Sequence, residues 1–376
     1  MLVLIFLSCD LWGNTRHSGL YLINEGGFWG YMNKHGVVVI EPQFSEARPF
    51  SEGLAAVCIS SRGWGFIDED GEFVIDPQFE YVADFHEGRA AFWVPNKLGF
   101  LDRSGTAVIA AKYHEVGNFS EGLAWVKDES SRDSVGYIDR AGRAAIPGQF
   151  FYADDFADGL ACVLDLAEWR WGYIDKAGAT AIPLRFRDAR PFSEGLACAR
   201  ESTKYGYIDK HGAFAIDAEY DGAGSFSEGL AVVRVDDRCG YISRNGAVSI
   251  PPQFDWGYAF SEGLAVVAVG DSFGYIDTEG RFAINPRYDG AYAFDGGLAV
   301  VIFTPGWGYI DKHGTVVWQS DTTTGALHST PPPGCFLPGR EPDCSPKYEN
   351  PDVSGVFPGF PAADLRSSDR MRSGKE

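Results

Sequence analysis

Six residues, FSEGLA, occur five times in this chain, and each copy places a carboxylate directly before a glycine. A carboxylate in such a turn could shuttle protons as a general acid or base. Related Phe–x–acid–Gly sequences bring the number of these acids to seven: Glu52, Glu87, Glu121, Asp158, Glu194, Glu228 and Glu262. An eighth copy, FDGGLA, has Gly296 in place of the acid. An active site needs its acid once or twice, so these acids predict a structural corner that accepts backbone N–H groups beside it.

A second motif, glycine–aromatic–aliphatic–Asp–x–x–Gly, also repeats, and its copies start 34 to 37 residues apart, at Gly30, Gly65, Gly99, Gly136, Gly172, Gly206, Gly240, Gly274 and Gly308. The aspartate can accept from N–H groups two or three residues further on, and the glycine can take a positive φ, as in a type I turn. Asn33 and Ser243 replace the aspartate in two copies, and a catalytic carboxylate would not tolerate serine. Asp68-Glu69-Asp70-Gly71 is similar to the start of a calcium loop but lacks the remaining ligand spacing, so we expect a turn.

One period predicts three strands, which we illustrate with the copy near Leu230. LAVVRV and CGYIS are expected to pair across a turn at residues 236–238, and AVSI follows the turn at residues 244–246. Proline cannot donate to a ladder, so Pro251-Pro252 is expected to end the third strand. The next residues lead to the following copy, with a short fourth strand as an option.

The strands are apolar on both faces, since Tyr207 and Ile208 of one strand point in opposite directions. A sheet with one wet face would alternate with polar residues. We therefore expect small sheets stacked face to face, with the motif glycine allowing a neighbouring sheet to approach. Such repeats fit either a β-propeller-like arrangement or an open superhelical array.

At these residues the chain resembles the WG-repeat family of bacterial β-repeat proteins. The Trp-Gly pair stands at Trp29-Gly30, Trp64-Gly65, Trp171-Gly172 and Trp307-Gly308, and other residues take the tryptophan position elsewhere. The resemblance extends from about Gly19 to Trp318. It implies an all-β repeat architecture and a role in protein contacts, and it brings no catalytic residues.

Composition limits the partners. A formal charge of −20 disfavours nucleic acid and anionic membrane surfaces, which are polyanions. Cys58, Cys162 and Cys198 lie in apolar runs and are interpreted as small buried hydrophobes. A zinc site has no support, because the sequence contains no C-x-x-C pair. We expect no metal site and no cofactor.

The ends of the chain differ from the repeats. Residues 1–18 are expected to be a leader: MLVLIFLSCD is too short to span a bilayer and lacks a preceding basic residue. Leu7-Ser8-Cys9 leaves a truncated export signal with a lipid anchor as an alternative to the favoured cytoplasmic location. Residues 19–319 are the predicted repeat array of about nine units. Residues 320–376 are rich in Pro, Gly and Ser and are expected to be a disordered tail, in which Cys335 and Cys344 could pair in an oxidising compartment.

Three periods exceed 34 residues, and the surplus lies between the first and second strands, at residues 59–63, 127–134 and 165–170. One edge of the array therefore tolerates insertions, as either a binding edge or an unconstrained one.

The leading functional hypothesis is a non-catalytic scaffold for protein–protein interaction. Two alternatives are cell-surface glycan binding through exposed Trp93, Trp169 or Trp256 and a hydrolase or lyase with its site in a propeller channel. The acid–base candidates of the second alternative are the seven histidines His17, His35, His86, His114, His211, His313 and His328.

Overall fold

The computed structural model describes residues 19–320, apart from residues 129–133 and residue 166. The residues so described belong to one compact unit of the chain and form 34 β-strands and no helix. The predicted all-β repeat fold is confirmed. The predicted leader, most of the predicted tail, His17, His328, Cys335 and Cys344 lie outside the described residues.

The strands group into nine units, numbered here in chain order. Units 1 to 3 comprise β1 (Leu20–Glu25), β2 (Phe28–Asn33) and β3 (Val38–Phe44); β4 (Glu46–Ala47), β5 (Ala55–Ile59), β6 (Gly63–Ile67) and β7 (Phe73–Phe79); and β8 (Tyr81–His86), β9 (Arg89–Val94), β10 (Lys97–Leu101) and β11 (Ala107–Val116). Units 4 to 6 comprise the end of β11 with β12 (Leu123–Asp128), β13 (Val135–Asp139) and β14 (Ala144–Phe150); β15 (Tyr152–Ala153), β16 (Ala161–Asp165), β17 (Arg170–Ile174) and β18 (Thr180–Phe186); and β19 (Asp188–Ala189), β20 (Ala197–Arg200), β21 (Tyr205–Ile208) and β22 (Phe214–Tyr220).

Units 7 to 9 comprise β23 (Gly222–Ala223), β24 (Leu230–Val235), β25 (Arg238–Ser243) and β26 (Val248–Phe254); β27 (Trp256–Ser261), β28 (Leu264–Val269), β29 (Ser272–Ile276) and β30 (Phe282–Tyr288); and β31 (Gly290–Ala291), β32 (Leu298–Phe303), β33 (Gly306–Asp311) and β34 (Val316–Gln319). Each unit is an antiparallel meander of an inner strand and three further strands, except that unit 1 has three strands among the described residues. The inner strand has two residues in units 2, 5, 6, 7 and 9 and six residues in units 3 and 8. The long β11 serves units 3 and 4, so β8–β14 form one seven-stranded sheet.

The predicted turn chemistry is confirmed. The Asp209 carboxylate accepts the N–H groups of His211 at 2.9 Å and Ala213 at 3.0 Å, and Gly212 has a φ of 83°. The supposed calcium loop is a turn of the same kind, in which Asp68 accepts from the N–H groups of Asp70 and Glu72.

The prediction that proline ends the third long strand is wrong. In unit 7, β26 continues through Pro251-Pro252 to Phe254, and its register with β25 shifts between the pairs Tyr241–Ile250 and Cys239–Phe254. Proline is tolerated there because β26 is the outer edge strand, where a missing N–H costs no ladder bond. The surplus residues form a bulge that folds over β25.

The bulge explains the glycine of the Trp-Gly pair. A Cβ on Gly240 would lie 2.5 Å from the Ile250 carbonyl oxygen and 2.6 Å from the Pro252 nitrogen. The sequence interpretation that this glycine admits a neighbouring sheet is therefore wrong, because the close backbone belongs to the same sheet. Each of the other eight units repeats this approach.

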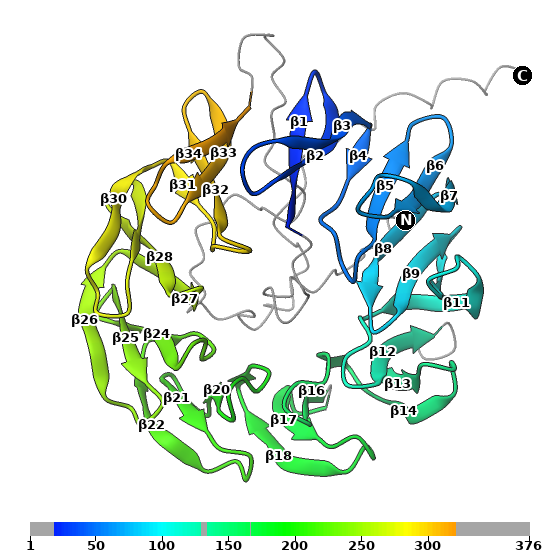
Figure 1. Ribbon diagram of the computed structural model, residues 1–376. Helices are drawn as coiled ribbons and strands as arrows, with labels where there is room; N and C mark the ends of the chain where they lie inside the picture. The colour runs from blue at the N-terminus through cyan, green and yellow to red at the C-terminus, as the bar shows by residue number, and fades with distance from the viewer. Residues whose placement is uncertain (1–18, 129–133, 166, 321–376) are drawn as a thin grey trace, which may run out of the picture. The chain divides into compact units, whose positions relative to one another are not determined.

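Face-to-face stacking of the sheets is confirmed. Tyr207 packs among residues of unit 7, including Phe226, whereas Ile208 of the same strand packs among residues of unit 5. Figure 1 shows the sheets following one another around a circle, with the short strands towards the centre and strands such as β22 and β26 outside.

The first and ninth units are in contact. Trp29 stacks on Trp307 with ring centroids 6.5 Å apart, and both belong to one buried cluster that also contains Tyr309. A Cβ on Gly36 would lie 2.7 Å from the carbonyl oxygen of Val317, much as the matching Gly246 lies against Ile216 of the unit before it. No described strand of unit 1 pairs with a strand of unit 9, so side-chain packing makes this contact. Of the two predicted arrangements, the propeller-like one is observed.

The turns lie on two sides of each sheet. Because neighbouring strands are antiparallel, consecutive turns of a meander fall at opposite edges. The Phe–x–acid–Gly corners and the Asp–x–x–Gly turns share one side, the corner face. The turns between the first and second long strands, which carry the three predicted insertions, lie on the other side, the loop face.

Candidate functional site

The repeated corner is a two-residue hairpin. In unit 7, Ser227 and Leu230 exchange two backbone hydrogen bonds of 2.9 and 3.1 Å. Glu228 and Gly229 between them have φ values of 55° and 80°, as a type I′ turn requires. A left-handed conformation is uncommon for glutamate and costs free energy, so another contact must compensate.

The corner acid bridges successive units. The Glu228 carboxylate accepts the N–H of Gly263, the corner glycine of unit 8, at 2.8 Å. The same bond is made in every unit that has the acid, by the pairs Glu52–Gly88, Glu87–Gly122, Glu121–Gly159, Asp158–Gly195, Glu194–Gly229 and Glu262–Gly297. The predicted acceptor role is confirmed, but the predicted donor beside the acid is wrong. The corner acids therefore link each unit to the next one.

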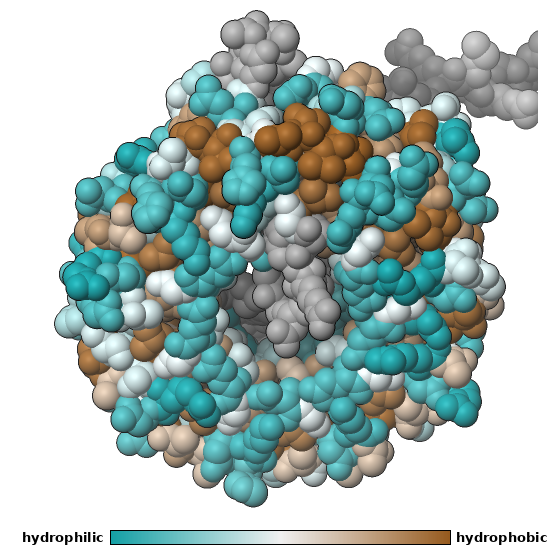
Figure 2. Space-filling model, in the orientation of Figure 1, coloured by the Kyte–Doolittle hydropathy of each residue, from teal (hydrophilic) through white to brown (hydrophobic). Residues whose placement is uncertain are grey.

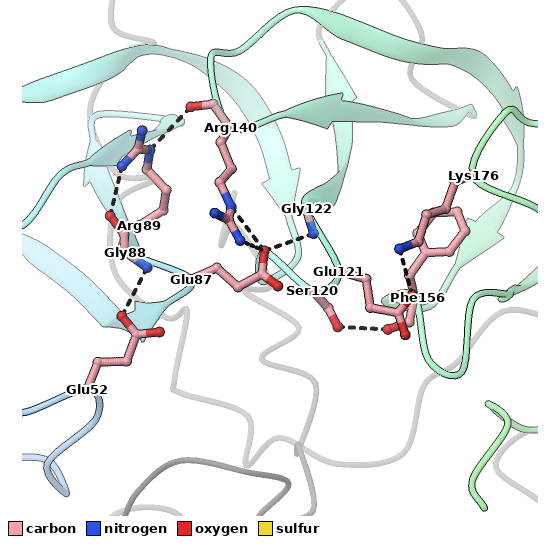
Figure 3. A network of polar contacts seen from close by, with 10 residues as sticks. All are labelled: Glu52, Glu87, Gly88, Arg89, Ser120, Glu121, Gly122, Arg140, Phe156 and Lys176. Carbon is pink, nitrogen blue, oxygen red and sulfur yellow. Dashed lines mark hydrogen bonds and ion pairs between the residues drawn. The ribbon is translucent and has the colours of Figure 1, made fainter.

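Basic side chains complete this bridge on the corner face. Arg140, in the Asp–x–x–Gly turn of unit 4, donates to Glu87 of unit 3 at 2.6 Å, and Lys176 of unit 5 lies 2.9 Å from Glu121 of unit 4. Figure 3 shows Glu87 with both partners, the Gly122 N–H and the Arg140 side chain, together with the Glu52–Gly88 and Glu121–Lys176 contacts. The pairs Arg103–Glu52 and Lys312–Glu262 repeat the arrangement.

An open depression of about 610 Å³ lies between the corners of units 3 and 4, lined by Glu87, Glu121, Gly122, Asp139, Arg140, Ala141 and Arg143. Its carboxylates already have partners, because Glu87 meets Arg140 and Asp139 accepts from Arg143. The Arg143 side chain lowers the pKa of Asp139, which keeps this carboxylate ionised.

We expect Glu228→Gln to leave the free energy of unfolding within about 0.5 kcal/mol, because the amide oxygen can still accept from Gly263. Unit 8 has Thr278 where other units place the base, so no salt bridge is lost. Glu228→Ala should cost about 1–2 kcal/mol, because the Gly263 N–H loses its acceptor. Urea unfolding of both variants measures the difference, and equal stabilities would contradict the bridging role.

The corner of unit 9 differs from the others. Asp295 replaces the serine of the motif, and Tyr21 of unit 1 donates to the carbonyl oxygen of Gly296 at 2.6 Å. Burial raises the pKa of Asp295 to about 7, and the negative charge of Glu262 adds to the rise. Burial also raises the pKa of Tyr21, with further contributions from Asp295 and Glu262.

This corner predicts a pH dependence of stability. A raised pKa means that the folded state binds the Asp295 proton more tightly than the unfolded state does. The contribution of this proton to the free energy of unfolding is therefore complete below about pH 4 and disappears as the pH rises through about 7. We expect Asp295→Asn to gain stability over the native protein between pH 5 and 8, on the order of 1–2 kcal/mol after allowance for solvent. Thermal melts across this range test it. Asp139→Asn is the control. The pKa of Asp139 is lowered, so this carboxylate changes its protonation only in acid, and the effect of the substitution should not vary between pH 5 and 8.

Charged and aromatic side chains of the loop side differ between units, unlike the corners. Between units 2 and 3, the Arg48 guanidinium lies 5.5 Å from the Trp64 ring centroid and donates to the Tyr81 hydroxyl, with Asp84 4.0 Å away. In unit 6, Tyr205 donates to the buried Asp188, and Arg200 lies over the Tyr205 ring. Burial, the charge of Asp188 and the hydrogen bond to it raise the Tyr205 pKa, so this phenol is no phenolate nucleophile near neutral pH.

The five histidines of the described residues lie in separate turns and strands. His35, His211 and His313 occupy equivalent turns of units 1, 6 and 9, whereas His86 and His114 lie in β8 and β11, which β9 and β10 separate. Cys162 and Cys198 are fully buried in β16 and β20, as predicted, and Cys58 of β5 is partly buried. Among the described residues, no group of three or more His, Cys, Asp or Glu is placed to hold a metal ion.

The three tryptophans proposed for glycan stacking differ in exposure. Trp93 and Trp256 are half-buried, and Arg234 lies 5.5 Å from the Trp256 ring centroid. Trp169 is 41% exposed, in line with its place among the exposed candidates, and has a left-handed φ of 50°, which the sequence did not indicate. The insertion at residues 165–170 is the sequence feature that marks the loop carrying Trp169.

Nine stacked antiparallel meanders, linked by repeated corner acids, define a propeller-like β-repeat protein. The family model for the WG containing repeat matches eight segments, residues 29–61, 64–92, 99–130, 136–165, 171–204, 205–239, 240–271 and 273–302. The chain belongs to this WG-repeat family. No curated protein shows significant similarity to it.

Solved structures with a similar fold are distant in sequence. A eukaryotic initiation factor is 12% identical with a TM-score of 0.56, and the alignment covers 80% of this chain and 95% of that one. BamB from Moraxella catarrhalis is 12% identical with a TM-score of 0.44 over 72% and 94% of the two chains. At this identity the initiation factor supports the fold alone. No helix among residues 19–320 that the structure describes could cross a membrane.

Proposed function

We propose that this protein is a non-catalytic scaffold that binds another protein. The observation that carries the proposal is the use of the repeated acids: each bonds to the corner glycine of the next unit, as Glu228 does to Gly263. The residues with the strongest potential for acid–base chemistry thus stabilise the stack. A rigid array of this kind offers an extended surface with which a partner can make many contacts.

The loop face is the better candidate for the binding surface. Corners on the opposite face repeat nearly the same residues in each unit, so a partner would find the same contacts in several registers. Side chains on the loop side differ from unit to unit, as Tyr152, Asp188 and Trp256 do at equivalent places in units 5, 6 and 8. Differences of this kind can specify one partner and one register.

The experiment is affinity capture with the immobilised protein, followed by reconstitution with the purified partner and calorimetry. We expect a stoichiometric protein complex that Glu228→Gln does not weaken, because that residue only links units. Loss of function in Glu228→Gln with an unchanged thermal melt would favour the hydrolase or lyase alternative. Binding of oligosaccharides without any protein partner would favour the glycan alternative, to which the exposed Trp169 contributes.

A further inference from the structure

Two successive units have enlarged turns between their first and second long strands. The turn from β12 to β13 and the turn from β16 to β17 belong to successive units and contain the two largest insertions of the repeat. Residues 129–133 of the first turn and residue 166 of the second lie outside the described residues. Insertions at one place of a repeat commonly mark its binding edge.

Trp169 projects from the second of these loops. The Asp165 carboxylate accepts the N–H groups of Ala167 and Glu168, each at 3.1 Å, and thereby fixes the loop. The Trp169 ring meets Phe151 edge to face, with centroids 5.2 Å apart, and Lys127 Nζ lies 6.0 Å from the Phe151 centroid. Trp169, Phe151 and Lys127 are called the aromatic ledge below.

An indole held in this way is available to a partner. Trp169 is 41% exposed although it is a large aromatic residue, and its left-handed φ of 50° is unfavourable for a bulky side chain. The fold therefore holds a strained residue with its ring partly in water. Exposed tryptophans on a supported edge are the residues that most often dominate protein interfaces.

The charge around the aromatic ledge favours a basic partner. Among the described residues, Lys127 lies 3.7 Å from Glu115, and Arg170 adjoins Trp169 in the sequence. Besides Glu115, the carboxylates of Asp128, Asp165 and Glu168 stand within five positions of these two bases in the sequence. The whole chain carries a formal charge of −20, so a cationic segment is attracted over longer range as well.

We propose that the aromatic ledge binds a basic segment of a partner protein, with an arginine or lysine side chain stacked on Trp169. A guanidinium over an indole face is the most favourable cation–π pair in proteins. The inference rests on the proposed protein-binding function and adds the site and the charge of the partner.

The test is selection of a displayed library of random 12-residue peptides on the intact protein, followed by synthesis of the enriched peptides. We expect enrichment of arginine and lysine, and affinity that falls by about tenfold or more between low and high salt. Trp169→Asn should weaken binding about tenfold or more, since asparagine tolerates the left-handed conformation but removes the ring. Trp169→Tyr should retain most of the affinity.

Phe28→Ala is the matched control. Phe28 is 50% exposed and begins β2, next to the β1–β2 turn on the same face. Figure 2 shows a hydrophobic area over β1–β3. Peptide binding that depends on Phe28 and not on Trp169 would overturn the proposal that the aromatic ledge is the binding site, while leaving the protein-binding function intact. Enrichment of acidic peptides, or oligosaccharide binding that Trp169→Asn abolishes, would also overturn it. If no peptide and no captured protein binds, both the proposed ledge site and the proposed function are contradicted.

Discussion

Replacing Gly240 with alanine should destabilise the protein by about 3 kcal/mol or more. The new Cβ would lie 2.5, 2.6 and 2.8 Å from three backbone atoms of Ile250, Pro252 and Pro251. Backbone atoms of a paired strand cannot move aside as a flexible side chain can, so β26 must separate from β25 or lose its bulge. Urea unfolding measures the loss.

Gly229→Ala is the control for this substitution. Gly229 has a φ of 80°, but a Cβ there would meet no atom within 4 Å. Alanine at this corner should therefore cost only the strain of a positive φ, about 1 kcal/mol. If Gly240→Ala costs no more than Gly229→Ala, the bulge does not explain why the motif requires glycine.

Replacing Trp307 with alanine should cost about 3–5 kcal/mol, the usual loss for a buried tryptophan. Trp307 is 1% exposed and lies against Trp318 of its own unit and Trp29 of unit 1, with ring centroids 4.8 and 6.5 Å away. Part of its stabilisation should therefore come from the contact between the first and ninth units.

A double-mutant cycle isolates that part. Trp29→Ala and Trp307→Ala together should show a coupling of about 0.5–1.5 kcal/mol, typical of an aromatic pair in contact. Trp29→Ala combined with Trp171→Ala should show none, because Trp171 is the matching residue of unit 5 and packs in a different cluster. Zero coupling between Trp29 and Trp307 would indicate an open array in solution.

Local chemistry was well predicted from the sequence. The turn of Asp209 and Gly212 follows from a short carboxylate and a residue without Cβ, whose interactions reach only four residues along the chain. The strands of unit 7 follow from β-branched residues between such turns, and β24 and β25 agree with the prediction. The position of the insertions, and so of Trp169, could also be read from the repeat spacing.

Contacts between repeats were not predictable in the same way. Because each copy has the same residues, the sequence cannot tell whether the Glu228 carboxylate binds a glycine of its own unit or Gly263 of the next. The bulge at Pro251-Pro252 was missed because proline stops an interior strand but not an outer edge strand, and that position is known only once the sheet is assembled.

The sequence by itself determined the class of the fold, the number and length of its units, and the residues that turn the chain. Those properties depend on interactions within one repeat, which the pattern displays nine times. Only the tertiary structure decided that the acids connect successive units, that the motif glycine lies under the bulge of its own sheet, and that Trp29 meets Trp307. The last of these depends on the small rotation between neighbouring sheets, summed over all units, and no single residue specifies that sum.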